Sequence, residues 1–349
     1  MSEPAAVANG SWTIQDARSL YNIDRWGARY FDVNDAGQVV ARPLQDAGVA
    51  VTLTDIAEEA RARGLKFPLL IRFQDILRHR VEAINKAFRS AIAEFNFNGQ
   101  YRGVFPIKVN QLREVVEEIL DAGKPFNFGL EVGSKPELFA GLAMQNQPGA
   151  LIICNGYKDA QFISMALMGI KLGKHVIMVV EKLEELKQII AVSRQVGVEP
   201  LIGIRARLAS KGAGKWAESG GENAKFGLST VELLAATELL RAEKLEHCFK
   251  LLHFHIGSQV PNIITIKNAV IEAAVPVTPA DAAVSVPSVT RTHRKSWAPC
   301  WTAVATCVPM SNFRGTIEPK LAEYALIEPM MTGTPTGPQA AVPATPITL

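Results

Sequence analysis

One lysine of this sequence occupies a place where a reactive amine could be formed. Lys108 closes an apolar run in the segment Gly103–Gln111, which reads Gly-Val-Phe-Pro-Ile-Lys-Val-Asn-Gln. A lysine at the carboxyl end of a barrel strand points into the region where the reacting groups of such folds collect. Partial desolvation there would favour the neutral, nucleophilic amine that Schiff-base chemistry needs. Lys108 is therefore a candidate catalytic residue; the alternative is a strand-end lysine that only reaches solvent.

Two histidines and a Gly-Ser pair lie together in Leu251–Gln259, which reads Leu-Leu-His-Phe-His-Ile-Gly-Ser-Gln. Because side chains alternate along a strand, His253 and His255 are expected on the same face. Both could line a barrel interior, or one could be a core histidine with no chemical role. Gly257 lets the backbone approach a ligand, and Ser258 offers a hydroxyl and an N–H group that suit a phosphate oxygen. The segment is a candidate ligand site, although a Gly-Ser pair alone is a weak signal.

Polar residues close several other predicted strands. Glu131 ends the second apolar run, Asn155 with Gly156 follows the third, and Arg205 and Arg207 end the fifth. The carboxyl ends of parallel barrel strands meet at one face, so these groups are expected to surround a common site. Structural ion pairs around the rim are the alternative.

A glycine- and lysine-rich segment at 210–225 superficially suggests a phosphate-binding loop. The Walker spacing fails, because Ala209 stands where the first glycine is needed and Trp216 follows Lys215 in place of serine or threonine. Since the segment follows a predicted strand, a loop over an active site is the better interpretation.

Regularly alternating elements position these residues. Short β-rich runs are predicted at 101–108, 126–132, 150–155, 175–181, 200–207 and 250–258. Helical patterns are predicted at 112–122, 135–144, 160–168, 182–196 and 230–240, preceded by an amphipathic helix between Leu70 and Ile92. The alternation indicates βαβ units, and the apolar strands indicate a parallel sheet buried on both faces. Even spacing without a Gly-rich dinucleotide turn favours a (βα)8 TIM-type barrel, of which only about six strands are present.

Composition excludes several function classes. The 349 residues are 48% apolar, with a formal charge of +3 from 37 basic and 34 acidic side chains. No Lys/Arg block argues for a nucleic-acid partner, and no apolar run suits a membrane span or signal peptide, so we expect a cytoplasmic protein. The four cysteines (154, 248, 300 and 307) lack CxxC spacing, which predicts neither a disulfide framework nor a zinc site.

The composition changes near residue 275. The stretch 275–349 holds 11 of the 20 prolines, which remove backbone donors and end helices. We predict an N-terminal extension with a leading helix over 1–100, a partial barrel over 101–274, and a Pro/Thr-rich disordered tail over 275–349. A second hypothesis is that the tail is a frameshifted or mis-joined end, because it contains Trp297, Trp301 and isolated cysteines.

Several long motifs, in order, resemble the biosynthetic arginine decarboxylase family. They are the segment around Lys108, Gly-Leu-Glu-Val-Gly-Ser-Lys-Pro-Glu-Leu, Ile-Cys-Asn-Gly-Tyr-Lys-Asp, Lys-Trp-Ala-Glu-Ser-Gly-Gly-Glu-Asn-Ala-Lys-Phe-Gly-Leu-Ser, and His-Phe-His-Ile-Gly-Ser-Gln. The resemblance covers about residues 11–274. It implies the alanine-racemase-like pyridoxal-phosphate fold, a (βα)8 barrel followed by a β domain.

The resemblance also implies roles for five residues. Lys108 would hold pyridoxal 5'-phosphate through a Schiff base, His255 would stack on the pyridine ring, and Ser258 would contact the phosphate. Glu131 and Arg205 match pocket-lining positions. The implied reaction is decarboxylation of L-arginine to agmatine and CO2 in polyamine (putrescine and spermidine) biosynthesis, with Mg2+ as a second cofactor whose ligands the sequence does not identify.

The segment after about residue 274 departs from the family pattern. The resemblance implies a Gly-rich phosphate loop, an acidic partner for the pyridine nitrogen and a β domain there, and none is found in 275–349. We therefore expect a truncated or frameshifted chain, inactive by itself, and a homo-oligomer only at full length, without nucleic-acid or membrane partners. A non-catalytic pyridoxal-phosphate-binding barrel and a pyridoxal-phosphate-dependent amino-acid racemase are alternative functions, which the long motifs disfavour.

Overall fold

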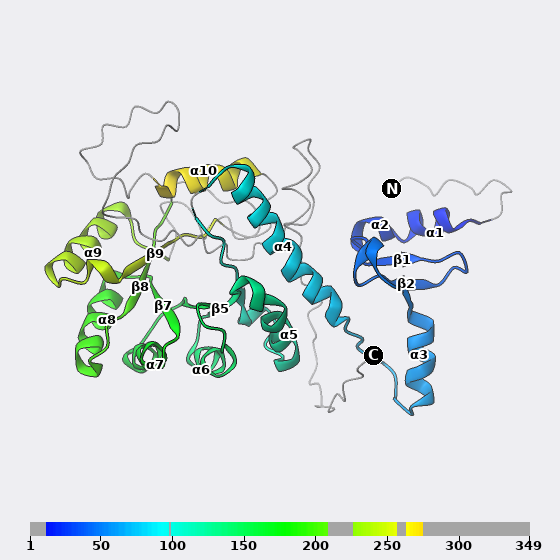
Figure 1. Ribbon diagram of the computed structural model, residues 1–349, viewed down its shortest axis with the longest axis horizontal. Helices are drawn as coiled ribbons and strands as arrows, with labels where there is room; N and C mark the ends of the chain where they lie inside the picture. Colours follow the sequence, from blue (N-terminus) through cyan, green and yellow to red (C-terminus); the bar gives the residue numbers. More distant parts are fainter. Residues whose placement is uncertain (1–11, 98, 209–225, 257–262, 275–349) are drawn as a thin grey trace, which may run out of the picture.

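The computed structural model describes residues 12–97, 99–208, 226–256 and 263–274 (Figure 1). Ser258, the glycine-rich segment 210–225 and the segment 275–349 lie outside the described residues. The fold therefore tests the expectations for the N-terminal extension and for most of the predicted barrel.

The N-terminal part contains a small antiparallel sheet that the sequence patterns did not predict. Its strands β1 (Phe31–Val33), β2 (Val39–Ala41) and β3 (Val51–Thr52) pair in the order β1-β2-β3. The flanking helices are α1 (Ile14–Leu20), α2 (Ile23–Trp26), η1 (Gln45–Ala47) and α3 (Leu53–Ala62). Strands of two or three residues are too short to show a period, which explains why they escaped the sequence analysis.

One long helix joins this small sheet to the rest of the molecule. Helix α4 (Gln74–Glu94) confirms the predicted leading helix, and Figure 1 places the small sheet beyond one of its ends. Val81 of α4 packs with Val115 and Ile119 of α5 (Arg113–Gly123) in a separate apolar cluster. Arg78 adds ion pairs to Glu118 and Asp121, so α4 is fixed against the first helix of the predicted barrel.

The larger unit is a parallel sheet with six strands in sequential order. They are β4 (Val104–Pro106), β5 (Gly129–Val132), β6 (Leu151–Cys154), β7 (His175–Val180), β8 (Leu201–Arg205) and β9 (Phe249–His253). The connecting segments hold α6 (Lys135–Met144), α7 (Ala160–Lys171), α8 (Leu183–Val196) and α9 (Thr230–Ala242), with α10 (Ile263–Ala274) after β9. Short 3-10 turns are η2 (Ile107–Val109), η3 (Lys124–Phe126) and η5 (Glu246–Cys248). The six predicted strands and the helices between them are confirmed.

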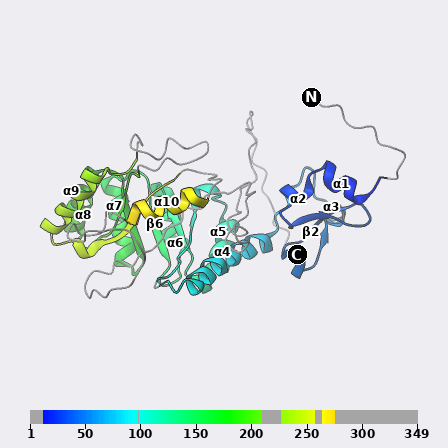
Figure 2. The same cartoon turned by 90° about the horizontal axis from the view of Figure 1, so that it is seen from above.

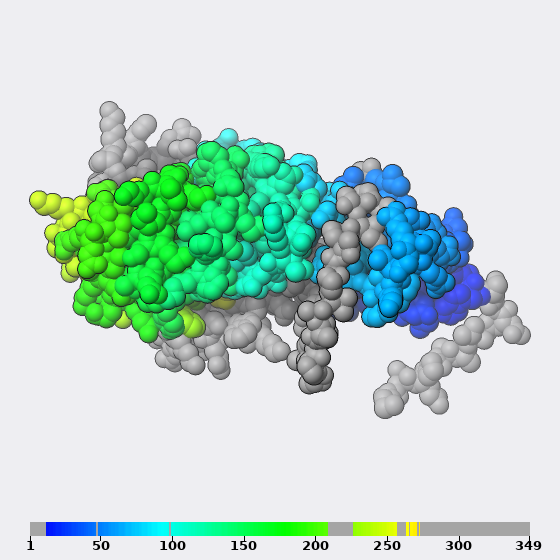
Figure 3. Space-filling view, turned by 90° about the horizontal axis from the view of Figure 1, so that it is seen from below, coloured from blue at the N-terminus to red at the C-terminus, as the bar shows by residue number. Residues whose placement is uncertain are grey.

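The inner strands β5 and β6 bury every residue and β7 buries all but His175, so these strands are covered on both faces as their apolar sequences require. The edge strand β9 leaves Lys250 exposed. Ile152 and Cys154 of β6 belong to the main cluster with the helices, whereas Leu151 and Ile153 belong to a second cluster on the opposite face. Helices α6, α7 and α8 lie side by side along the first face, and their side chains form a continuous surface (Figures 1 and 3). Figures 1 and 2 show α10 apart from this row of helices, and its buried Ala269 belongs to the main cluster. Burial of one such aliphatic side chain contributes about 1.5–3 kcal/mol, so the two clusters together stabilise the sheet.

The sheet remains open within the part of the chain that the structure describes. β4 and β9 are its edge strands, and no pairing joins them. The arrangement is an incomplete (βα)8-type barrel, as the strand count predicted. None of the described helices has the length and apolarity to cross a membrane.

Candidate active site

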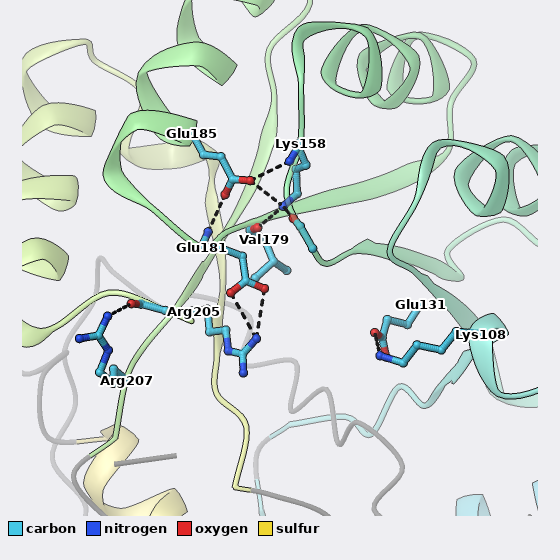
Figure 4. A network of polar contacts seen from close by, with 10 residues as sticks. Lys108, Glu131, Lys158, Val179, Glu181, Glu185, Arg205 and Arg207 are labelled. Carbon is cyan, nitrogen blue, oxygen red and sulfur yellow. Dashed lines mark hydrogen bonds and ion pairs between the residues drawn. The ribbon is translucent and has the colours of Figure 1, made fainter. Parts of the chain in front are cut away.

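Lys108 lies at the carboxyl edge of the sheet, where the sequence predicted it, but in the turn η2 rather than on the strand. Pro106 of β4 pairs with Glu131 of β5, and this register places Glu131 beside the turn. The Lys108 Nζ atom lies 3.3 Å from Glu131 Oε1 (Figure 4). The Lys108 side chain is 64% exposed and that of Glu131 is 3% exposed, so an accessible amine rests on a buried carboxylate.

Arg205, at the end of β8, is held by a carboxylate that the sequence analysis did not single out. Its Nη1 donates to both oxygens of Glu181, at 3.1 and 3.2 Å, and both side chains are largely buried. The guanidinium also lies over the Phe226 ring, 5.4 Å from its centroid. Glu181 directly follows β7, so its position after an apolar strand was the signal that could have identified it.

A second lysine lies at the same edge and was also missed. Lys158 follows β6 and is fully buried; its Nζ donates to the carbonyl oxygens of Gly156 and Val179 and lies 3.6 Å from Glu185 Oε1. Glu185 also accepts from the backbone N–H groups of Lys158 and Glu181, at 2.8 and 2.7 Å. A single carboxylate therefore joins the loop after β6 to the end of β7, which fixes the residue that holds Arg205 (Figure 4).

The two histidines lie at and just after the end of β9. His253 is 3% exposed, and burial, followed by the nearby Arg205 charge, lowers its pKa to about 3. Burial, Arg205 and Lys108 lower the pKa of His255 to about 4. Both imidazoles are thus neutral near pH 7. The charge of Lys108 contributes to both pKa shifts. The Lys108 amine, which follows edge strand β4, therefore interacts electrostatically with the two histidines at the end of edge strand β9.

Several buried polar atoms at this edge lack a partner among the described residues. They are Glu131 Oε2, Asn155 Oδ1 and both ring nitrogens of His253. Buried polar atoms in proteins are almost always hydrogen-bonded, so such a group is typical of a place that receives a polar ligand. An accessible amine, a buried carboxylate, neutral imidazoles and a fixed guanidinium fit a phosphorylated aldehyde cofactor bound through Lys108.

The structure does not bring every predicted residue to this site. Arg207 Nη2 donates instead to the carbonyl oxygen of Gly227 at 2.8 Å, which ties the end of β8 to the segment before α9. Ser258 and Gly257 lie outside the described residues, so their predicted phosphate contact stays a prediction.

The family model for the pyridoxal-binding domain of pyridoxal-dependent decarboxylases matches residues 81–286. This range contains the whole parallel sheet with Lys108, Glu131, Arg205 and His255. The chain belongs to the pyridoxal-dependent decarboxylase family.

Within this family, the chain is similar to biosynthetic arginine decarboxylases. The chain is 49% identical over 263 residues to the biosynthetic arginine decarboxylase of Bacteroides thetaiotaomicron and 48% identical over 263 residues to that of Thermosynechococcus vestitus. Each alignment covers 75% of this chain but only 42% and 41% of the relative, so the chain spans about two fifths of their length.

Solved structures give the same result for the fold. The crystal structure of the biosynthetic arginine decarboxylase from Campylobacter jejuni matches with a TM-score of 0.65 and 36% identity, over 73% of this chain and 41% of that one. A diaminopimelate decarboxylase from M. jannaschii matches with a TM-score of 0.54 at 20% identity, over 71% of this chain and 52% of that one, which supports the fold alone.

Proposed function

We propose that this chain carries the cofactor-binding part of a decarboxylase that converts L-arginine to agmatine and CO2 for polyamine biosynthesis. The observation that carries the proposal is the accessible Lys108 amine on the buried Glu131 carboxylate, within electrostatic reach of two neutral histidines. The identity to biosynthetic arginine decarboxylases supports arginine as the substrate class.

Each residue of the site has a proposed task. Lys108 would hold pyridoxal 5'-phosphate covalently, and Glu131 would orient the Lys108 amine through the contact at 3.3 Å. His255, neutral because it is buried beside Arg205, could stack on the cofactor ring without adding a charge. Ser258 stays a proposed phosphate contact. When bound, the cofactor supplies a conjugated ring that accepts the electrons left after CO2 departs.

Proton movement can be assigned to the amine of Lys108. Once substrate has taken its place, Lys108 Nζ is free to exchange a proton with the substrate Cα, since its side chain is 64% exposed and held by one carboxylate contact. Burial keeps the two histidines neutral, and the positive charge of Arg205, fixed by Glu181, would add to this effect.

Further expectations for the whole protein are also proposals. We propose a cytoplasmic enzyme that forms homo-oligomers at full length and uses Mg2+. The one group of three potential ligands within the described ranges contains a thiol and an imidazole, unlike the oxygen ligands that Mg2+ prefers. Because the relatives are longer, we keep the hypothesis that the 349-residue chain binds the cofactor but does not turn over arginine by itself.

Borohydride reduction in the presence of pyridoxal phosphate tests the role of Lys108. Reduction fixes a lysine Schiff base, and peptide mass spectrometry locates the label. We expect the label on Lys108 and its loss in Lys108→Ala. Lys135→Ala is the matched control, since Lys135 is an exposed lysine at the same edge, paired with Asp159. A label that survives in Lys108→Ala would overturn the proposed site.

Release of labelled CO2 then tests the substrate and the inactivity hypothesis separately. The chain is supplied with arginine, ornithine or lysine and with pyridoxal phosphate. Labelling of Lys108 without CO2 release supports a binding-competent, inactive chain. CO2 released from arginine at a normal rate contradicts the inactivity hypothesis, and preference for ornithine or lysine contradicts the proposed substrate.

A further inference from the structure

A second group of potential ligands lies at the opposite end of the sheet from Lys108. Glu199 precedes β8, and His247 and Cys248 lie in η5, directly before β9. One ligand atom from each side chain lies within 4.8 Å of the other two. The strand β8 alone, at about 3.3 Å per residue, puts roughly 13 Å between Leu201 near this group and Arg205 at its far end. This group is therefore separate from the proposed active site.

Two of the three separations are close to those between ligands of one small cation, and the third is at most 4.8 Å. His247 Nε2 lies 3.0 Å from Glu199 Oε2 and 3.5 Å from Cys248 Sγ. In a tetrahedral zinc site, bonds of about 2.0 Å to nitrogen and oxygen and about 2.3 Å to sulfur separate these atom pairs by about 3.3 and about 3.5 Å. A ring nitrogen has one N–H or one lone pair, so it cannot form two well-directed hydrogen bonds to both neighbours. A cation between the three atoms satisfies them together.

The surroundings leave the group accessible. The Cys248 residue is buried, whereas the His247 and Glu199 side chains are 57% and 70% exposed. The neighbouring carboxylate of Glu246 is held by Arg241 at 2.9 Å and does not belong to the group. The exposed imidazole and carboxylate thus leave the group open to a cation from solvent.

We propose that Glu199, His247 and Cys248 bind one Zn2+ ion, with water completing the tetrahedron. Thiolate, imidazole and carboxylate are the three ligand types that zinc uses in proteins. On binding, the Cys248 thiol releases its proton to solvent and its sulfur bonds to the metal. Sequence spacing gives no hint of this site, because Glu199 is 48 residues from His247.

The bound ion would act as a clamp on the edge strand. The β8–β9 ladder shifts register between Ile202 and Gly203, close to its amino end. Zinc would join the segments that lead into these two strands immediately before this irregularity. We therefore expect zinc to stabilise β9 without contacting the proposed decarboxylase site.

Titration of the purified chain with Zn2+, and with Co2+ as a spectroscopic probe, tests the site. We expect a thiolate-to-cobalt charge-transfer band and a rise in melting temperature with Zn2+. His247→Ala and Glu199→Gln should weaken the binding that gives these signals by at least about 100-fold, because even outer-shell changes at zinc sites cost 10–100-fold. Cys248→Ser should abolish the charge-transfer band. Glu246→Gln and His175→Ala, which alter a neighbouring carboxylate and another exposed histidine, are matched controls that should bind as the unaltered chain does.

Two results would overturn the zinc site. One is the absence of a charge-transfer band and of any thermal stabilisation in the unaltered chain. The other is equal binding by His247→Ala, which replaces an exposed side chain and leaves the buried thiol in place. Neither result affects the labelling test of Lys108, so the two proposals fail independently.

Discussion

Two lysines at one edge of the same sheet have opposite environments. Lys108 has a side chain that is 64% exposed and one carboxylate contact at 3.3 Å. Lys158 is fully buried and is surrounded by two backbone carbonyl oxygens and Glu185. An ammonium group has three donors, and those of Lys158 all face protein oxygens whereas those of Lys108 do not. The comparison separates a lysine available for chemistry from one that holds the fold.

The glutamates show the same contrast. Glu185 accepts two backbone N–H groups in addition to its contact with Lys158, so its carboxylate is well satisfied. Glu131 is 3% exposed, yet one of its oxygens has no partner among the described residues. A buried carboxylate with an unsatisfied oxygen is costly for stability, and such a cost is typical of functional sites.

The largest expected effect concerns Lys158. Lys158→Met removes the buried charge that faces Glu185 and two carbonyl oxygens, and breaking a buried pair costs about 3–5 kcal/mol. We expect the free energy of unfolding, measured by urea denaturation, to fall by that amount. Lys187→Met is the control, since Lys187 is an exposed lysine paired with Glu184 and should change stability by less than about 1 kcal/mol. Equal effects of the two substitutions would show that Lys158 has no structural role.

The second prediction compares the stability changes caused by Glu181→Gln and Glu131→Gln. Glu181→Gln weakens the hold on the largely buried Arg205, and a hydrogen bond to a charged group contributes about 1.5–3 kcal/mol. Glu131→Gln removes a poorly satisfied carboxylate, so we expect less than about 1 kcal/mol of change in stability together with weaker pyridoxal phosphate binding. Urea denaturation and cofactor titration of both variants measure this difference. A larger stability loss in Glu131→Gln than in Glu181→Gln would reverse our assignment of the two carboxylates.

The third prediction is a pH dependence of stability caused by His253. An unfolded histidine binds a proton below about pH 6.5, whereas burial keeps His253 neutral down to its pKa of about 3. Its contribution to stability is therefore present above pH 6.5 and is lost progressively as the pH falls toward 3, with a slope of at most about 1.4 kcal/mol per pH unit.

Substitution of His253 separates its contribution to the pH dependence of stability from those of other groups that titrate in acid. His253→Gln should reduce the decline of unfolding free energy between pH 6.5 and 4, while His255, whose pKa is also lowered, retains part of it. His175→Gln, at an exposed histidine, is the control. An identical slope in His253→Gln would mean that this histidine does not resist protonation in the folded chain.

Much of the fold could be predicted from the sequence because its strands are continuous apolar runs separated by long helices. Leu151–Cys154 and His175–Val180 show this clearly, since burial on both faces leaves no polar position in their interiors. The small sheet of β1–β3 could not be predicted, because its pairs involve only two or three residues per strand.

The site was only partly predictable for a different reason. Lys108, Glu131 and Arg205 lie at or close to the carboxyl ends of strands, where position alone suggests a role. The functions of Glu185 and Lys158 depend on which backbone groups reach their side chains, and one such partner of each is 27 and 21 residues away in the sequence, respectively. Ends of strands can be located from a pattern, but hydrogen bonds between loops cannot.

Lys108→Met has the smallest expected effect on stability and gives the most direct test of the difference between Lys108 and Lys158. Lys108→Met removes a single contact of an exposed amine, and exposed ion pairs contribute about 0–1 kcal/mol, so the unfolding free energy should change by less than about 1 kcal/mol. The same substitution should abolish Schiff-base labelling, because methionine has no amine. Urea denaturation and reductive labelling of this variant give both readings. A stability loss as large as that of Lys158→Met would mean that Lys108 is a structural lysine, whereas full stability without labelling is the behaviour of a residue kept for chemistry.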